Sequence, residues 1–270
     1  MKRAAILIFL LLFAALPLRA EATLERLIDL LEIDAYNLII REEGLADADS
    51  LSLDLLGRPA DSALMTELDR IYDTDRMAAH VRDTLRREMT PLHLTRAAAY
   101  FSSDPSQHII SLEVAARRAM SSDELEEAAT RGWIAAEEEH PWLVARVREM
   151  SDVNDLLERN VAGALNANLH FFRGLAQGDA LQMSEAEILS QVWSQEDQIR
   201  GETDLWIGAY LTLAYKPLEE PVLTDYIAFW STETGKALNR AIFSAFNDIY
   251  NEISFATGRI LALSVETQEL

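Results

Sequence analysis

The residues with the clearest potential for metal chemistry are Glu137 and His140, the first and last residues of the segment EEEH. On a helix, a Glu-x-x-His spacing places a carboxylate and an imidazole on one face, where they can share a metal ion. A di-iron bundle needs two such motifs. The histidines that lack an acid three positions earlier are His80, His93, His108 and His170. Because Pro141 follows at once and interrupts the helix, we interpret the motif as a solvated helix end and predict no metal and no other cofactor.

Motifs for nucleophilic catalysis and for phosphate binding are missing from the sequence. It has no cysteine, no Gly-x-Ser-x-Gly elbow, no Ser-x-x-Lys pair and no glycine-rich phosphate loop. Paired carboxylates such as Glu219 and Glu220 are common in so acidic a chain, and the helix dipole favours them in first turns. The sequence therefore predicts a protein that is not an enzyme and acts by binding.

The element that organises the chain is a pair of helices over residues 223–250. Leu223, Ile227 and Trp230 fall on one helical face, and the apolar period resumes from Leu238 onward. The segment STETG (231–235) interrupts this pattern. We expect Gly235 to take the positive φ of a tight corner, and Thr232 or Thr234 to cap the following helix. Two amphipathic helices with a short corner must bury their faces together, so the segment is predicted to be a helical hairpin.

A degraded copy of this hairpin lies 129 residues earlier in the chain. Leu94, Thr95, Ala99 and Ser102 are identical to the residues at 223, 224, 228 and 231. A second match pairs Gly-Leu-Ala at 44–46 with Gly-Leu-Ala at 174–176. Two matches in the same order indicate an internal duplication of about 130 residues, and chance similarity between Ala- and Leu-rich helices is the alternative.

The remaining segments favour an all-α, multi-helix bundle. No segment alternates β-branched and polar residues as a strand would. We expect Gly44 to end an early helix and Gly201 to break a later one. From Trp142 to residue 175 we expect one long helix that crosses from one repeat to the next. The predicted organisation is a signal peptide over 1–20, a first repeat over 21–140 and a second over 141–270, packed as one compact body.

The second copy of the hairpin resembles a family of exported bacterial proteins, the domain of unknown function 2059. The matching positions are Leu223, Phe229, Trp230, Ser231, Gly235 and Lys236. The resemblance is specific over about 40 residues, and the first copy departs from it because Ser106 and Gln107 replace the Gly-Lys pair. The resemblance implies a mostly helical exported protein and supplies no catalytic residues.

Aromatic residues are concentrated in the second repeat, and most of them fall at the spacing of a helix core. The others could line a groove for an apolar ligand or a partner helix, because large aromatic side chains give much contact area. The candidate contact residues are Tyr226, Phe229, Trp230, Gly235, Lys236 and Phe246. The first copy carries Glu113 and Arg117 where the second has Ile242 and Phe246, so we expect the two halves to have different roles.

The N-terminus and the net charge indicate where the protein acts. Lys2 and Arg3 precede an apolar run that ends at Ala20, which is typical of a secretory signal peptide cleaved after Ala20; an uncleaved anchor is the alternative. The formal charge of −21 repels nucleic acid and anionic membranes. We therefore predict a periplasmic or secreted protein with no membrane segment after signal removal, able to meet a basic partner or divalent cations.

Two functional hypotheses lead, and an enzyme of unfamiliar type comes third. The first is a periplasmic interaction or accessory protein that meets an unknown protein partner through its second repeat. The second is a carrier of a small apolar or lipid ligand held between helices. A carrier requires a sizeable apolar cavity beneath Phe229, Trp230 and Phe246, whereas an interaction protein requires these residues to fill a closed core.

Overall fold

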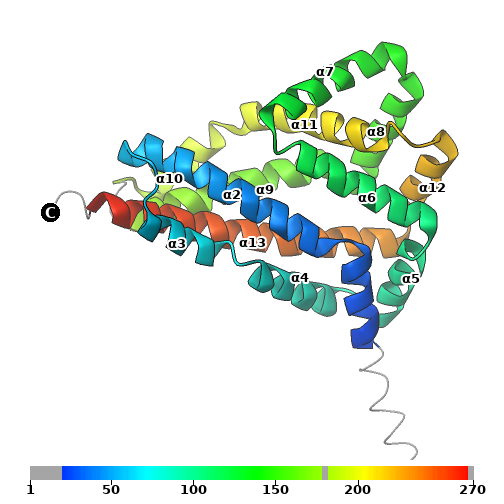
Figure 1. Ribbon diagram of the computed structural model, residues 1–270, viewed down its shortest axis with the longest axis horizontal. Coiled ribbons are helices and arrows are strands. Elements are labelled where there is room, and N and C mark those ends of the chain that lie inside the picture. Colours follow the sequence, from blue (N-terminus) through cyan, green and yellow to red (C-terminus); the bar gives the residue numbers. More distant parts are fainter. Residues whose placement is uncertain (1–19, 178–181, 267–270) are drawn as a thin grey trace, which may run out of the picture.

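The fold is all-α, as the helical periodicity predicts. A computed structural model describes residues 20–177 and 182–266, and these ranges contain no strand. A first helix covers residues 20–30. The helices that follow are α2 (Ile33–Leu56), α3 (Ser62–Ile71), α4 (Thr74–Glu88), α5 (Pro91–Phe101), α6 (Asp104–Ala119), α7 (Asp123–Glu139), α8 (Pro141–Asn154), α9 (Leu156–Gln177), α10 (Glu185–Trp193), α11 (Glu196–Tyr215), α12 (Glu220–Ser231) and α13 (Glu233–Glu266). In Figure 1 they form a multi-helix bundle, in which α2, α9 and α13 run along the long axis and α7 lies at one edge.

The predicted signal peptide falls on residues 1–20, and all but its last residue lie outside the described ranges. Among the helices of those ranges, none has both the length and the apolar character that a bilayer crossing requires.

Two sharp joints between helices were not visible in the sequence pattern. Asp155 adopts a left-handed conformation with φ of 55°, so α8 ends at Asn154 and α9 starts at Leu156. The prediction of one long helix here is therefore wrong. An equivalent joint precedes α2, where Glu32 has φ of 51°. An aspartate reaches this conformation at modest cost, since its short polar side chain can bond locally.

Glycine was expected to end helices at two positions where the helix continues. α2 passes through Gly44, and α11 passes through Gly201. Gly44 is explained by packing, because a β-carbon there would lie 2.1 Å from the Tyr72 ring. α2 ends instead at Gly57, whose φ of 68° is a conformation that glycine adopts without steric cost.

The predicted hairpin is the pair α12 and α13, and Thr232 builds its corner. The Thr232 hydroxyl accepts a hydrogen bond from the Gly235 backbone N–H at 3.0 Å, which is the geometry of a helix N-cap. Gly235 lies inside α13 without a positive φ, contrary to the sequence expectation. It is needed for close approach, because a β-carbon there would lie 2.3 Å from the Phe229 carbonyl oxygen.

The upstream pair, α5 and α6, has the same local plan. Ser103 caps α6 by accepting a hydrogen bond from the Ser106 backbone N–H at 3.4 Å. Ser106 stands at the position of Gly235, and its hydroxyl donates to the Tyr100 carbonyl oxygen at 3.1 Å. The same close contact is therefore made by a hydrogen bond in one corner and by a missing side chain in the other.

One apolar core joins helices from both predicted repeats, from Leu27 in the first helix to Ile253 in α13. Within it, α9 and α13 cross at backbone contact through Gly174 and Gly258. A β-carbon on Gly174 would lie 2.2 Å from the Phe255 carbonyl oxygen, and one on Gly258 would lie 2.3 Å from the opposite backbone. These two glycines therefore set the distance between the two helices.

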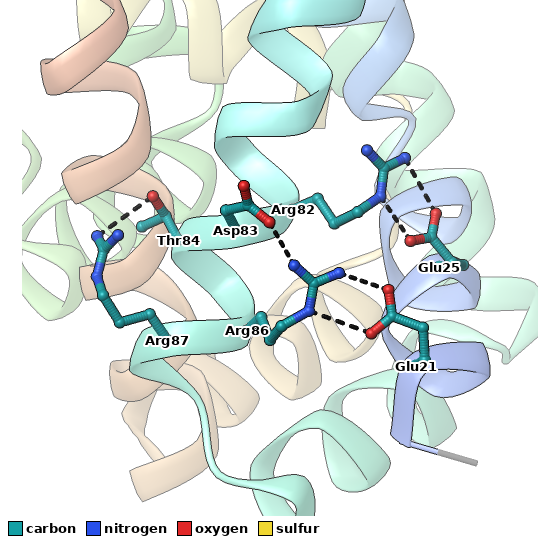
Figure 2. A network of polar contacts seen from close by, with 7 residues as sticks. All are labelled: Glu21, Glu25, Arg82, Asp83, Thr84, Arg86 and Arg87. Carbon is teal, nitrogen blue, oxygen red and sulfur yellow. Dashed lines mark hydrogen bonds and ion pairs between the residues drawn. The ribbon is translucent and has the colours of Figure 1, made fainter. Parts of the chain in front are cut away.

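The first helix is tied to α4 by paired charges, as Figure 2 shows. Arg82 donates to Glu25 at 2.5 and 3.1 Å, and Arg86 donates to Glu21 at 3.1 and 2.5 Å. All four side chains are partly exposed to solvent, which screens such pairs. The buried Leu27 on the same helix should therefore contribute more to its attachment.

We expect Arg82→Met to lower the free energy of unfolding by less than about 1 kcal/mol, because the ion pair with Glu25 is partly solvated. Leu27→Ala, in contrast, should cost about 3 kcal/mol. Chemical denaturation of both variants measures the difference. Equal losses would show that the ion pairs hold the first helix in place.

Candidate ligand-binding cavity

A cavity of about 320 Å³ lies between helices of both predicted repeats. Its walls come from α2, α6, α8, α9, α11, α12 and α13, and most of the lining side chains are apolar or aromatic. The aromatic ones are Tyr36, Tyr210, Tyr215, Tyr226, Trp230, Phe243, Phe246 and Tyr250. The exposed Asn160 also belongs to the lining and marks where the wall reaches the surface. Both the volume and the lining are typical of small-molecule sites.

A buried carboxyl group forms the polar part of this cavity. Glu113 of α6 is only 9% exposed. The Tyr215 hydroxyl donates to its Oε1 at 2.6 Å, and the Tyr226 hydroxyl donates to its Oε2 at 3.2 Å. Burial raises the pKa of Glu113 to about 7, while the two tyrosine hydrogen bonds oppose that rise. Its carboxyl group therefore changes charge near neutral pH.

The tyrosines around Glu113 stay protonated and act as hydrogen-bond donors. Burial raises the pKa of Tyr210, Tyr215 and Tyr226 well above the ordinary value. Tyr210 also donates to the Glu113 backbone carbonyl at 3.4 Å, and it shares a side-chain hydrogen bond with Tyr36. These neutral hydroxyls orient the carboxyl group without adding a positive charge.

Arg117, the basic residue nearest in sequence to Glu113, forms its ion pair with a different acid. Arg117, one helical turn later, forms a two-pronged ion pair with Glu43 of α2 and lies 5.6 Å from the centre of the Trp206 ring. Among the described residues, no basic side chain forms an ion pair with Glu113. A carboxylate at this position is therefore buried without a counter-charge.

Trp230 brings an unpartnered donor to the same region. Its side chain lines the cavity and is 8% exposed. The indole N–H lies beside the Tyr226 hydroxyl, but it makes no hydrogen bond of normal geometry with any described residue.

The structure separates the six candidate contact residues into two groups. Tyr226, Trp230 and Phe246 line the cavity. The other three lie elsewhere: the Phe229 ring stacks on Tyr100 with centroids 4.0 Å apart, Gly235 packs against the backbone of α12, and Lys236 is exposed on the first turn of α13.

Positions that the sequence alignment pairs meet in this cavity. Glu113 and its counterpart Ile242 both line it, as do Arg117 and its counterpart Phe246. The divergence at these positions predicts separate roles for the two halves, and this stays a prediction. Both helix faces line the cavity, and Glu113 was not among the candidate contact residues. The available signal was an acid one helical turn after Ile109 and Ile110, on the face of α6 that these isoleucines share.

The Glu-x-x-His segment lies outside the cavity. Glu137 accepts a hydrogen bond from Arg148 at 2.6 Å, and His140 stands at the junction of α7 and α8. Within the described ranges, no three side chains of the metal-binding types gather closely enough to hold an ion.

Comparisons with protein-family models, with curated proteins and with solved structures found no match for this chain. The resemblance to the domain of unknown function 2059 therefore stays a prediction.

Proposed function

We propose that the protein is a non-catalytic carrier of a small, largely apolar molecule, which it holds in the cavity between its helices. The observation that supports this proposal is an aromatic cavity beside Trp230 and Phe246. The carrier hypothesis requires a cavity beneath Phe229, Trp230 and Phe246. Trp230 and Phe246 line one, whereas Phe229 is buried against Tyr100, as an interaction protein would require. The cavity therefore favours the carrier over the interaction hypothesis.

The size of the cavity limits the ligand. An engineered apolar cavity of about 150 Å³ binds benzene, so a volume of about 320 Å³ has room for about a dozen non-hydrogen atoms. A single ring with a short branched chain fits this limit.

The polar side chains of the cavity suit recognition better than catalysis. Among the described residues, its lining includes no serine, cysteine, histidine or lysine, so a proton could be carried there by Glu113 or by the tyrosines. Glu113 is held by Tyr215 and Tyr226. An acid fixed by neutral donors is a group that can orient a ligand.

We also propose that the cavity formed by duplication of a helical unit. Three correspondences support this. The left-handed joints at Glu32 and Asp155 both precede a long helix. The corners at Ser103 and Thr232 have the same caps. In addition, α4 packs on α13 as α11 packs on α6. A site between two such units would be lined from both.

Export is a further part of the proposal, supported by the basic and apolar residues 1–20. The carrier would then meet its ligand in the periplasm or outside the cell. Detection of a mature chain that begins at Glu21 in an extracellular or periplasmic fraction tests this point.

Native mass spectrometry of the protein, purified from its own cells under gentle conditions, tests the carrier function. We expect a reproducible additional mass in the range of a small metabolite, which is lost on denaturation. A clean mass for the protein alone, together with no binding of apolar probes, would contradict the proposal.

We expect Ile242→Trp to abolish ligand retention, because the larger side chain projects into the cavity and overlaps the bound molecule. The matched control is Ile134→Trp on α7, at a side chain that is 62% exposed. The bound mass should disappear in the first variant and persist in the second. Retention in both variants would place the ligand elsewhere.

A further inference from the structure

We infer that the ligand is an amphipathic cation, namely a small amine or quaternary ammonium with an apolar part. Its charge would lie against Glu113, and its apolar part against the aromatic walls of the cavity. This inference rests on the proposed carrier function and names the chemical class of the ligand.

The missing counter-charge of Glu113 favours a cationic ligand. Glu113 lies in a buried site, and the nearby Arg117 is already paired with Glu43. A buried charge is costly unless it is paired. Tyr215 and Tyr226 occupy two of about four acceptor sites that a carboxylate offers. A positively charged ligand would supply the missing partner and find acceptor sites that are still open.

The aromatic walls of the cavity also favour a cationic ligand. Aromatic faces carry negative electrostatic potential and attract cations, and quaternary ammonium groups are recognised in cages of such rings. The rings that line this cavity include Tyr36, Tyr210, Tyr215, Tyr226 and Trp230. The whole chain adds a formal charge of −21, which raises the local concentration of cations.

An anionic ligand fits the same site less well. Arg117 lines the cavity and could in principle receive an anion. Its guanidinium already forms two hydrogen bonds with the Glu43 carboxylate. An anion would therefore compete with Glu43 and would also face the negative charge of Glu113. A cation meets neither obstacle.

Calorimetric titration with three probes of similar size tests the inference on the full chain. Benzyltrimethylammonium is the cation, neopentylbenzene is its neutral isostere, and phenylacetate is the anion. At pH 8 we expect the cation to bind at least about tenfold more tightly than the isostere, and phenylacetate to bind most weakly. Glu113→Gln should remove this preference, because the amide has a similar shape and no charge; one of the two tyrosine hydroxyls must then accept from the amide N–H instead of donating.

The pH dependence of probe affinity in the unaltered protein tests the same inference without a substitution. The groups that face Glu113 are neutral, since Tyr36, Tyr210, Tyr215 and Tyr226 stay protonated, while Arg117 and Glu43 neutralise one another. The pKa of Glu113 is about 7, so its negative charge is lost at lower pH. Affinity for benzyltrimethylammonium should fall about tenfold between pH 8 and pH 6, whereas affinity for neopentylbenzene should stay constant.

The outcomes separate this inference from the carrier function. Binding of neopentylbenzene as tight as that of the cation, or tighter binding of phenylacetate, overturns the cation assignment and leaves the carrier standing. A cation affinity that is unchanged in Glu113→Gln and flat with pH overturns it as well. Failure of all three probes to bind overturns both proposals.

Discussion

Gly174→Ala is expected to destabilise the protein by about 3 kcal/mol. The added β-carbon would lie 2.2 Å from the Phe255 carbonyl oxygen and 2.8 Å from the Arg259 backbone nitrogen. Both of these atoms belong to the backbone of α13, so no side-chain rotation can relieve the overlap. The two long helices must move apart, and the core that they share loses contacts. Chemical denaturation followed by circular dichroism measures the loss.

Gly201→Ala is the matched control for this prediction. Gly201 lies in the interior of α11 and is exposed, and a β-carbon there meets no atom within 4 Å. Alanine should therefore stabilise the helix by up to about 1 kcal/mol, through its higher helix propensity. A Gly174→Ala variant as stable as Gly201→Ala would show that α9 and α13 do not cross at backbone contact.

Glu113→Gln should stabilise the protein at pH 8 by about 3 kcal/mol and have little effect at pH 4. In the folded protein, burial raises the pKa of Glu113 from 4.5 to about 7. The folded state therefore holds this proton more tightly than the unfolded state does. The contribution of protonated Glu113 to the free energy of unfolding is complete below pH 4.5. It falls as the pH rises from 4.5 to about 7, and it stays lost above that range. Glutamine has no proton to lose, so the variant lacks this decline.

The measurement is the free energy of unfolding of both proteins between pH 4 and pH 8. The difference between the two curves isolates Glu113 from the many other carboxylates of the chain. Glu88→Gln, at a partly exposed acid paired with Arg87, serves as the control for the loss of one carboxylate elsewhere on the protein. A difference curve that is flat with pH would mean that Glu113 ionises as readily in the folded protein as in the unfolded chain.

A variant that is more stable than the natural protein would also bear on function. Natural proteins keep destabilising groups where a site needs them. An unpaired acid among aromatic rings is such a group, and a bound cation would recover the stability that it costs.

The sequence by itself determined the helices and many of their ends. The caps at Asp61 and Ser184 were predictable because each bonds backbone N–H groups only two or three residues away. The hairpin corner at Thr232 is local in the same sense. Helical periodicity also gave the all-α class, since an apolar face repeats every turn whatever that face contacts.

The tertiary structure alone decided which faces meet. Gly44 and Gly235 were misread because their role is to admit a distant ring or a neighbouring backbone, not to turn the chain. The site itself joins Glu113 to Tyr215 and Tyr226, which lie 102 and 113 residues further along the chain. Contacts over such separations depend on how helices pack, and periodicity carries no information about that. The sequence therefore supplied an acid and a set of aromatic residues, and only folding brought them together around one cavity.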